Sequence, residues 1–122
     1  MCRDAKYAVL DDHDYRGLPT DSAERKSLPF FSGVMKYFPL ALLEVARVSR
    51  IGNDKHNPGE DLHWSRGKSD DHADAASRHL LDYAVGTIKD PSGSYHLANA
   101  AWRVLAQLQI DLEEANASGE AK

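Results

Sequence analysis

The sequence contains little of what marks several common protein classes. It has one cysteine, Cys2, among 122 residues, which excludes an intrachain disulfide framework and a cysteine-rich zinc module and fits a reducing compartment. Its net charge is −4, and a general duplex-DNA binder is not expected because phosphate contacts need a surplus of cations. No apolar run approaches the roughly 18 residues of a membrane span, and the N-terminus lacks the apolar stretch of a signal peptide. We therefore expect a cytoplasmic protein without membrane or duplex nucleic-acid partners.

The short motifs that identify many enzymes are also missing. The sequence has no glycine-rich P-loop, no G-x-G-x-x-G fingerprint and no G-x-S-x-G nucleophile elbow. What is present is an ordinary globular composition, with 42% hydrophobic and 28% charged residues. We predict a single domain over residues 1–122, with an irregular arm at 1–24 and a frayed tail at 116–122.

Three segments have the composition and period of helices. Residues 38–52 are rich in Leu, Ala, Glu and Arg, and residues 95–115 repeat apolar side chains every three to four positions. Residues 69–86 place apolar and polar side chains on separate helical faces. No segment alternates convincingly as a β-strand does. The prediction is an all-α protein, a helical bundle of three main helices completed by oligomerisation, because three helices make only a thin core.

Local signals set the expected helix ends. Pro39 suits a first turn, where its missing N–H costs little, and Gly52-Asn53 suits a helix stop. Ser69 is the expected N-cap of the second main helix. The polar loop between these two helices, residues 53–68, is long for a small domain, and loops of that length are usually functional or disordered. It concentrates hydrogen-bonding and aromatic groups, namely Lys55, His56, Asn57, His63, Trp64, Arg66 and Lys68.

Three carboxylates are candidate metal ligands. Glu44 lies among apolar helical residues, where a carboxylate is costly unless it is paired, protonated or bound to a metal. Asp71 and Asp74 fall three residues apart, on one side of a helix. If the two helices pack antiparallel, the three carboxylates form a site for Mg²⁺ or Mn²⁺. The alternatives are a salt bridge from Glu44 to a cation such as Arg78, and a solvated acidic face for the aspartates.

Histidines form a second cluster in the sequence. Five of the six lie between positions 56 and 96: His56, His63, His72, His79 and His96. Their spacings match neither H-E-x-x-H nor Cys/His patterns, which argues against zinc. Each alone is typical of a hydrogen-bonding structural residue, whereas together they could bind phosphate or polarise a nucleotide base.

Basic and aromatic residues lie near the candidate carboxylates in sequence. Lys55, Arg66, Lys68 and Arg78 are the cations, and metal-binding acids beside such cations are what a triphosphate site requires. Trp64 or His63 could stack on a base. The alternatives are ordinary solvated charges and, for Trp64, packing at a junction between loop and helix.

Several combined motifs resemble one known family. HNPG is followed by LHW-x-RGKS, then by RHLLD, then by D-x-x-G-x-x-H and AWR. Over about residues 25–115 this pattern resembles the dATP/dGTP diphosphohydrolase N-terminal domain family of phages and bacteria. Its members are similar to the MazG-like all-α nucleotide pyrophosphohydrolases, and the MazZ-type phage enzymes that cleave dGTP are the functional model.

The resemblance implies a set of metal ligands. MazG-like enzymes carry E-x-x-E on one helix and E-x-x-D on a later one, and these acids bind Mg²⁺. Glu44 matches the first element, and Asp71-x-x-Asp74 matches the second in spacing and placement. Arg47 stands where the first element has its second acid, so that pair is incomplete. Asp82 or His79 could supply the missing ligand, and Asp90 and His96 match further recurring family positions.

The resemblance also implies a function. The prediction is a metal-dependent pyrophosphohydrolase that converts a purine (deoxy)nucleotide such as dGTP or dATP to the monophosphate and pyrophosphate, as a homodimer or homotetramer. Glu44, Asp71 and Asp74 would hold Mg²⁺ or Mn²⁺, and Glu44 would orient or deprotonate the attacking water. The predicted phosphate-binding residues are Lys55, Lys68 and Arg78, those for base and sugar are Asn57, His63 and Trp64, and possible additional residues are His79, Asp82, Asp90 and His96.

Two other functions remain open from the sequence. The incomplete acidic pair around Glu44 favours a non-catalytic helical module that binds a nucleotide or a protein. The histidine cluster favours a zinc-bound structural protein. If the gene belongs to a phage, the expected location is the host cytoplasm.

Overall fold

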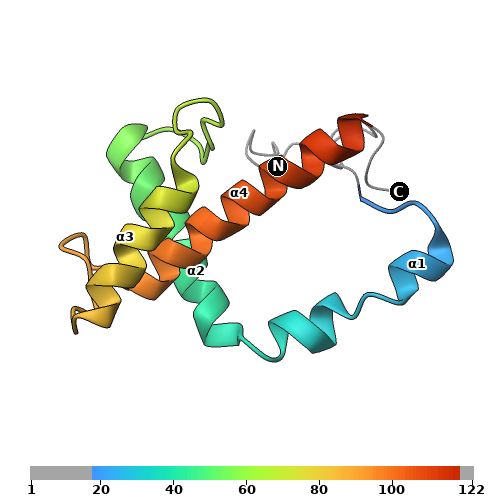
Figure 1. Cartoon of the computed structure of the whole chain (residues 1–122), viewed down its shortest axis with the longest axis horizontal. Helices are drawn as coiled ribbons and strands as arrows, with labels where there is room; N and C mark the ends of the chain where they lie inside the picture. Colours follow the sequence, from blue (N-terminus) through green and yellow to red (C-terminus); the bar gives the residue numbers. More distant parts are fainter. Residues whose placement is uncertain (1–17, 119–122) are drawn as a thin grey trace.

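The computed structural model describes residues 18–118, and within this range the chain forms helices and no β-strand (Figure 1). The elements, in chain order, are α1 (Ser22–Lys26), the π-helix η3 (Phe31–Met35), α2 (Pro39–His56), α3 (His72–Ala84) and α4 (His96–Ser118). The β pairing in this range is a single isolated bridge between Lys89 and Tyr95. The predicted all-α class is confirmed, with α2, α3 and α4 as the main helices. Cys2, arm residues 1–17 and tail residues 119–122 lie outside the described residues.

The first main helix, α2, continues one turn beyond its expected stop. Gly52-Asn53 was expected to end the helix, but both residues lie inside it, and Asn53 is only 8% exposed. The helix ends just before Pro58, because the residue that precedes a proline is kept out of the α region. That residue, Asn57, has φ −135° and ψ 58°. Pro39 occupies the first turn, as predicted.

The start of α3 also differs from expectation. The helix begins at His72, so Ser69 is not its N-cap. Asp71 takes the N-cap position but makes no capping hydrogen bond with its side chain. Its carboxylate instead accepts a hydrogen bond from Arg78, 3.1 Å away on the same helix. A charge pair with a residue two turns further along α3 has therefore replaced a side-chain cap.

The expected arm and tail contain more helix than predicted. α1 forms within the end of the arm, where Asp21 caps it by accepting a 2.9 Å hydrogen bond from the backbone N–H of Glu24. α4 extends to Ser118, into the expected tail. No single helix in the described range is long and apolar enough to cross a membrane, although a bent pair, Ser22–Met35 with Pro39–His56 at 91°, passes that length and composition test together.

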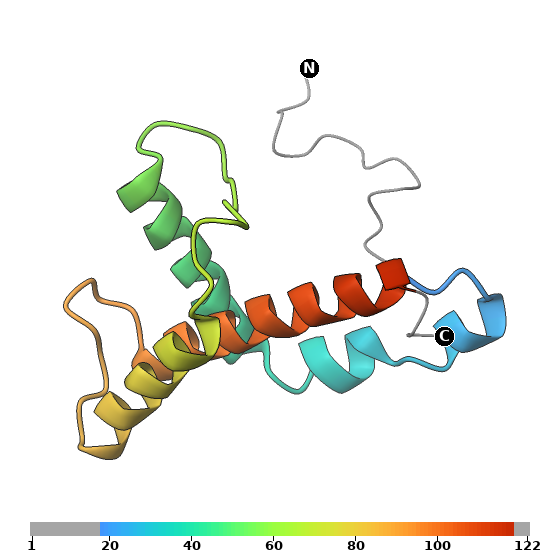
Figure 2. The same ribbon diagram turned by 45° about the horizontal axis from the view of Figure 1, so that its top comes forward.

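α4 is the helix on which the other two main helices pack. α3 lies along α4, and α2 crosses α4 (Figures 1 and 2). α2 and α3 make no helix-to-helix contact in the described chain, which corrects the expectation that the Glu44 helix packs antiparallel to the Asp71–Asp74 helix. The α3–α4 interface is lined by small side chains such as Ala76 and Ala98, which allow close approach of the two backbones.

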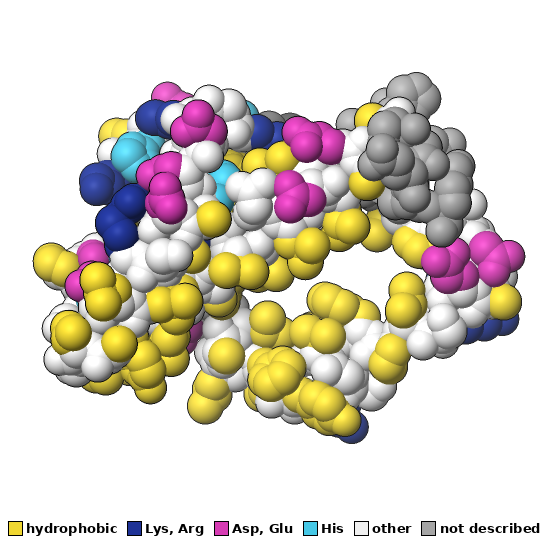
Figure 3. Space-filling model, in the orientation of Figure 1, with side chains coloured by type: hydrophobic (Ala, Val, Ile, Leu, Met, Phe, Trp, Pro, Cys, Tyr) yellow, Lys and Arg dark blue, Asp and Glu magenta, His cyan; other side chains and the backbone are white. Residues whose placement is uncertain are grey.

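The buried apolar core is made of small side chains. Within residues 18–118 the buried hydrophobic residues are Ala75, Ala76, Ala98, Ala100 and Ala106. In contrast, Leu40 and Leu43 of α2 are 77% and 62% exposed, and Leu105 and Leu108 of α4 are each 50% exposed. Figure 3 shows hydrophobic side chains along the edge of α4 and over η3. One chain therefore leaves most of its large apolar side chains uncovered.

Candidate functional site

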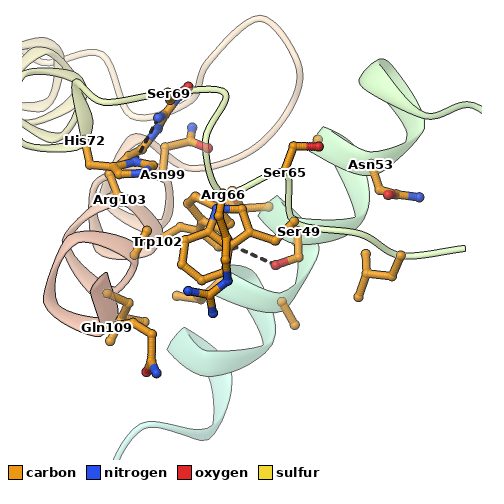
Figure 4. A pocket seen from close by; sticks show the side chains of 18 of the residues that line it. Ser49, Asn53, Ser65, Arg66, Ser69, His72, Asn99, Trp102, Arg103 and Gln109 are labelled. Atoms are coloured by element: carbon orange, nitrogen blue, oxygen red, sulfur yellow. Dashed lines mark hydrogen bonds between the residues drawn. The ribbon is translucent and has the colours of Figure 1, made fainter. Parts of the chain in front are cut away.

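An open cleft of about 1500 Å³ lies between α2, α4 and the loop that joins α2 to α3 (Figure 4). Leu42, Val45, Leu105 and Leu108 contribute apolar surface to it. Its polar lining includes Ser49, Asn53, Lys55, Asn57, His63, Arg66, Lys68, His72, His79, Asp90, Asn99 and Arg103. The cations Lys55, Arg66, Lys68 and Arg103 outnumber the one acidic lining residue, Asp90. The cleft lining therefore has a surplus of cationic residues although the whole chain is acidic, and two of these cations, Arg66 and Arg103, also face carboxylates outside the lining.

Asn53 fixes the polar loop of the cleft. Its Oδ1 accepts hydrogen bonds from the backbone N–H of His63 at 3.0 Å and from the side chain of Asn57 at 3.2 Å. Its Nδ2 donates to the carbonyl oxygen of Glu60 at 3.0 Å. The buried amide of Asn53 therefore makes hydrogen bonds to three residues of the loop, which explains how a long polar segment is held in one conformation.

Trp64 lies at the junction between the loop and α4. Its ring meets the Trp102 ring edge to face at 5.7 Å, and the guanidinium of Arg66 lies 4.0 Å from its centroid. Arg66 donates to Glu113 at 2.6 Å, and Trp102 Nε1 donates to Ser49 Oγ at 2.7 Å. Trp64 therefore makes the packing contacts of a junction residue and also lines the cleft. Base stacking by this ring stays a prediction.

A charged network lies beside the cleft at the start of α3. Asp71 faces Arg78 at 3.1 Å and Arg103 at 3.9 Å. The hydrogen bond from Arg78 lowers the pKa of the Asp71 carboxyl, which stays ionised. Arg103 Nη1 lies 3.0 Å from His72 Nδ1, and burial lowers the pKa of His72, which is 2% exposed. The neutral His72 imidazole can then accept from the guanidinium.

The predicted carboxylate ligands lie apart from the cleft lining. Glu44 pairs with Arg47 at 3.1 Å on the same helix, whereas the sequence suggested Arg78 as its salt-bridge partner. The pairing is local because α2 does not contact α3. Asp74 is exposed on the first turn of α3. Glu44, Asp71, Asp74 and Arg78 are not cleft-lining residues, whereas Lys55, Asn57, His63, Trp64, Lys68, His79 and Asp90 are.

A second group of predicted residues does come together. His79 Nδ1 lies 2.9 Å from His96 Nδ1, and His96 Nε2 lies 3.8 Å from Asp82 Oδ2. One nitrogen of each histidine and one oxygen of Asp82 all lie within 4.8 Å of one another. Within residues 18–118 this is the one such group of three His, Cys, Asp or Glu side chains, which makes it a possible metal site. We call it the His–Asp cluster.

The fold explains how this cluster is assembled. His79 and Asp82 are one turn apart on α3, and His96 is the first residue of α4. The backbone N–H of His96 donates to Ile88 at 2.9 Å, which closes the turn between the helices. Asp90, in that turn, accepts from the backbone N–H of Ser92 at 2.9 Å. This hydrogen bond lowers the pKa of Asp90, while burial and the nearby His96 lower the pKa of His79.

The sequence predicted no site role for Asn53, Trp102 or Arg103. Asn53 was predicted as a helix stop at the start of the polar loop, Trp102 as part of the apolar repeat of the last helix, and Trp102 with Arg103 as part of the AWR motif. A signal for Arg103 does exist in the sequence, because it lies three residues from both Ala100 and Ala106, which are buried on α4. An arginine on the alanine face of an amphipathic helix needs an internal partner.

The comparisons with known proteins bear on this chain at the level of the family. The sequence model of the family described as dATP/dGTP diphosphohydrolase, N-terminal, matches residues 20–119. Neither the curated proteins nor the solved structures give a match. The matched segment contains α2, α3, α4 and every polar residue of the cleft, and it confirms the resemblance drawn from the motifs. The chain belongs to the dATP/dGTP diphosphohydrolase N-terminal family.

Proposed function

We propose that this protein is a metal-dependent nucleoside triphosphate pyrophosphohydrolase that converts a purine deoxynucleotide such as dGTP or dATP to the monophosphate and pyrophosphate. The observation that carries the proposal is the family match, which spans residues 20–119 and includes the polar cleft. We further propose that it acts in the cytoplasm, or in the host cytoplasm if a phage encodes it.

The charge of the cleft supports a polyphosphate ligand. Lys55 and Lys68 are exposed at its wall, and Arg103 lies deeper, beside His72. Cations of this kind bind phosphate oxygens through charge-assisted hydrogen bonds. The whole chain has a net negative charge, so the surplus of cations at the cleft results from how the fold places these residues and not from the overall composition. In the proposal Lys55, Lys68 and Arg78 hold the phosphates, although Arg78 is outside the cleft lining and pairs with Asp71.

The loop supplies groups suited to a base and a sugar. Trp64 presents an aromatic surface at the cleft, and Asn57 and His63 lie on the same loop. Asn53 holds the side chain of Asn57 and the backbone of His63, so this part of the loop is ordered before a ligand binds. We propose that the three side chains bind the nucleoside.

The hydrolytic reaction requires a metal ion, and Mg²⁺ or Mn²⁺ would neutralise phosphate oxygens when bound. The carboxylates of Glu44, Asp71 and Asp74 are suitable donors for such hard ions. One chain does not gather them, because α2 and α3 do not touch. We propose that Glu44 orients the attacking water and that a neighbouring subunit completes the acidic set.

The uncovered apolar side chains support a homodimer or homotetramer. Leu40 and Leu43 on α2 and Leu105, Leu108 and Leu112 on α4 form what we call the open apolar face, and each is at least 46% exposed. The fully buried hydrophobic residues of the described chain are alanines, so one copy lacks an adequate core. Burial of this face against a second copy would place subunit contacts beside the cleft, which shares Leu105, Leu108 and Leu112.

The test is release of pyrophosphate from the common dNTPs and NTPs, with Mg²⁺ or Mn²⁺ and with EDTA. The expected result is metal-dependent formation of monophosphate and pyrophosphate, fastest for one purine. No release from any triphosphate, in a sample with a helical circular-dichroism spectrum, would overturn the proposal.

A second candidate function is a non-catalytic helical module that binds a nucleotide or a protein. The observation that favours it is the pairing of Glu44 with Arg47, which engages the carboxylate expected to act on water. Saturable binding of dGTP or dATP without turnover would support this function against the hydrolase.

A further inference from the structure

We propose that His79, Asp82 and His96 bind one divalent transition-metal ion of the Zn²⁺ or Co²⁺ type, at the junction of α3 and α4. The inference does not depend on the proposed hydrolase activity. It adds a site distinct from the carboxylate set of Glu44, Asp71 and Asp74, and it can be tested without any nucleotide.

The geometry is close to that of a three-ligand metal site. In a tetrahedral site with metal–nitrogen distances of about 2.0–2.1 Å, ligand atoms lie about 3.3 Å apart. The two Nδ1 atoms are 2.9 Å apart here, and one nitrogen of each histidine and one oxygen of Asp82 lie within 4.8 Å of one another. The 3.8 Å contact of Asp82 is to Nε2, the other ring nitrogen of His96. The Asp82 side chain is 53% exposed, so a rotation about its side-chain bonds can bring its carboxylate closer to the two histidines. A fourth position would stay open to water.

The two histidines are held in place by the fold. His96 is 3% exposed, and its backbone is fixed by the hydrogen bond to Ile88 and by the neighbouring Lys89–Tyr95 bridge. The Nδ1 atom of His96 faces the Nδ1 atom of His79, so the two rings meet at their nitrogens. At a 2.9 Å separation, one of these nitrogens must carry a proton and the other a lone pair. A metal ion would take the place of that shared proton.

The surroundings suit a metal that histidine binds. The negative charge of Asp90 acts on both His79 and His96, and Ser92 holds that carboxylate in position. Metal-binding histidines are commonly supported by such a neighbouring carboxylate. Imidazole nitrogen favours Zn²⁺, Co²⁺ and similar ions over Mg²⁺ and Ca²⁺, which prefer oxygen. His79 and Asp90 also line the cleft, so the open coordination position would lie near its wall.

The competing explanation is a metal-free histidine pair that only joins α3 to α4. The two explanations differ in what they predict for Asp82. A structural pair needs His79 and His96 but gains little from a carboxylate 3.8 Å away, whereas a metal site needs all three side chains.

The experiment is titration of the metal-stripped full chain with Co²⁺, followed by visible absorption, and with Zn²⁺, followed by calorimetry. We expect one ion per chain and visible bands characteristic of nitrogen and oxygen ligands at low coordination number. Asp82→Asn should weaken binding at least about 10-fold, and His79→Gln should abolish it. His56→Gln, which removes an exposed histidine of α2, is the matched control and should bind as the unmodified chain does.

Three outcomes would overturn the proposal. One is the absence of saturable Co²⁺ or Zn²⁺ binding by the folded chain. A second is binding that survives Asp82→Asn and His79→Gln as well as it survives His56→Gln. Displacement of Co²⁺ by an equal concentration of Mg²⁺ would also contradict it, because the site would then lack the selectivity of its imidazole donors. Asp82→Asn keeps the test meaningful if the buried His96 cannot be replaced without unfolding.

Discussion

Polar side chains around the cleft find their partners within one copy of this chain, whereas the leucines of the open apolar face do not cover one another. Around the cleft, Asn53 makes three hydrogen bonds and the Asp71–Arg103–His72 network is continuous. In residues 18–118 one buried side-chain nitrogen, His72 Nε2, lacks a hydrogen-bond partner. On the open apolar face, leucines remain half exposed or more. The polar lining of the cleft is therefore largely built by a single chain, whereas the open apolar face, which contributes Leu105, Leu108 and Leu112 to the same cleft, stays exposed in one copy.

The largest effect is expected from Glu44, which lies on α2 beside the open apolar face. Glu44→Gln removes the group proposed to orient water and should reduce pyrophosphate release about a thousandfold. The helical circular-dichroism signal should stay largely intact, because Glu44 is partly exposed and pairs only with Arg47. Glu24→Gln on α1 is the control. Unchanged turnover in Glu44→Gln would reject a catalytic role.

The next effect concerns assembly. Leu43→Glu places a charge on the open apolar face, at a side chain that is 62% exposed in one copy. If a second copy buries this leucine, the substitution should weaken self-association about 100-fold by desolvating a carboxylate. Analytical ultracentrifugation of Leu43→Glu and of the control Arg50→Glu, also on α2, measures this. Equal association of both variants would mean that this face is not the interface.

On the polar side, the single most informative change is Asn53→Ala. It removes three hydrogen bonds and leaves the N–H of His63 and the carbonyl of Glu60 without their partner, which should lower the unfolding free energy by about 2 kcal/mol. Asp54→Ala, at the next and exposed position, should change it little. Urea denaturation of the two variants gives the comparison. Similar midpoints would show that the loop is held by other contacts.

The smallest effect is expected from pH. Burial lowers the folded-state pKa of His72 below its ordinary value of 6.5, so the unfolded chain binds more protons than the folded one in that range. Stability should therefore be fully present above pH 6.5 and should fall as the pH drops below it, by less than about 1 kcal/mol per pH unit. His72→Gln should flatten this part of a urea-midpoint profile. A profile with the same slope would assign the dependence to other groups.

Local patterns were enough to predict the helices but not their packing. Apolar spacing located α2, α3 and α4, and Pro39 marked the start of α2. The expected α2–α3 contact was wrong because the buried face of α3 is made of alanines that fit closely against α4. The predicted end of α2 at Gly52-Asn53 was wrong. Asn53 belongs to the helix, and its side chain makes hydrogen bonds to the backbone of Glu60 and His63 in the loop, a tertiary role that helix propensity does not report.

In the candidate site, too, contacts between residues close in sequence could be predicted, whereas a contact between two helices could not. The loop residues Asn57, His63 and Trp64 were predicted as a group and do line one cleft, because they are close in sequence. His79 and His96 are separated by 17 positions, so their spacing matches no short metal motif, although their ring nitrogens meet at 2.9 Å. A contact of this kind depends on the turn between two helices, which the sequence indicates only as a turn.

The central claim is that the chain cleaves a purine deoxynucleoside triphosphate between its α- and β-phosphates. The most direct measurement is product analysis by phosphorus NMR after incubation with dGTP or dATP and Mg²⁺ or Mn²⁺. We predict equal amounts of monophosphate and pyrophosphate, and none of either when EDTA is present. Formation of the diphosphate with inorganic phosphate, or no product from a folded sample, would contradict the account.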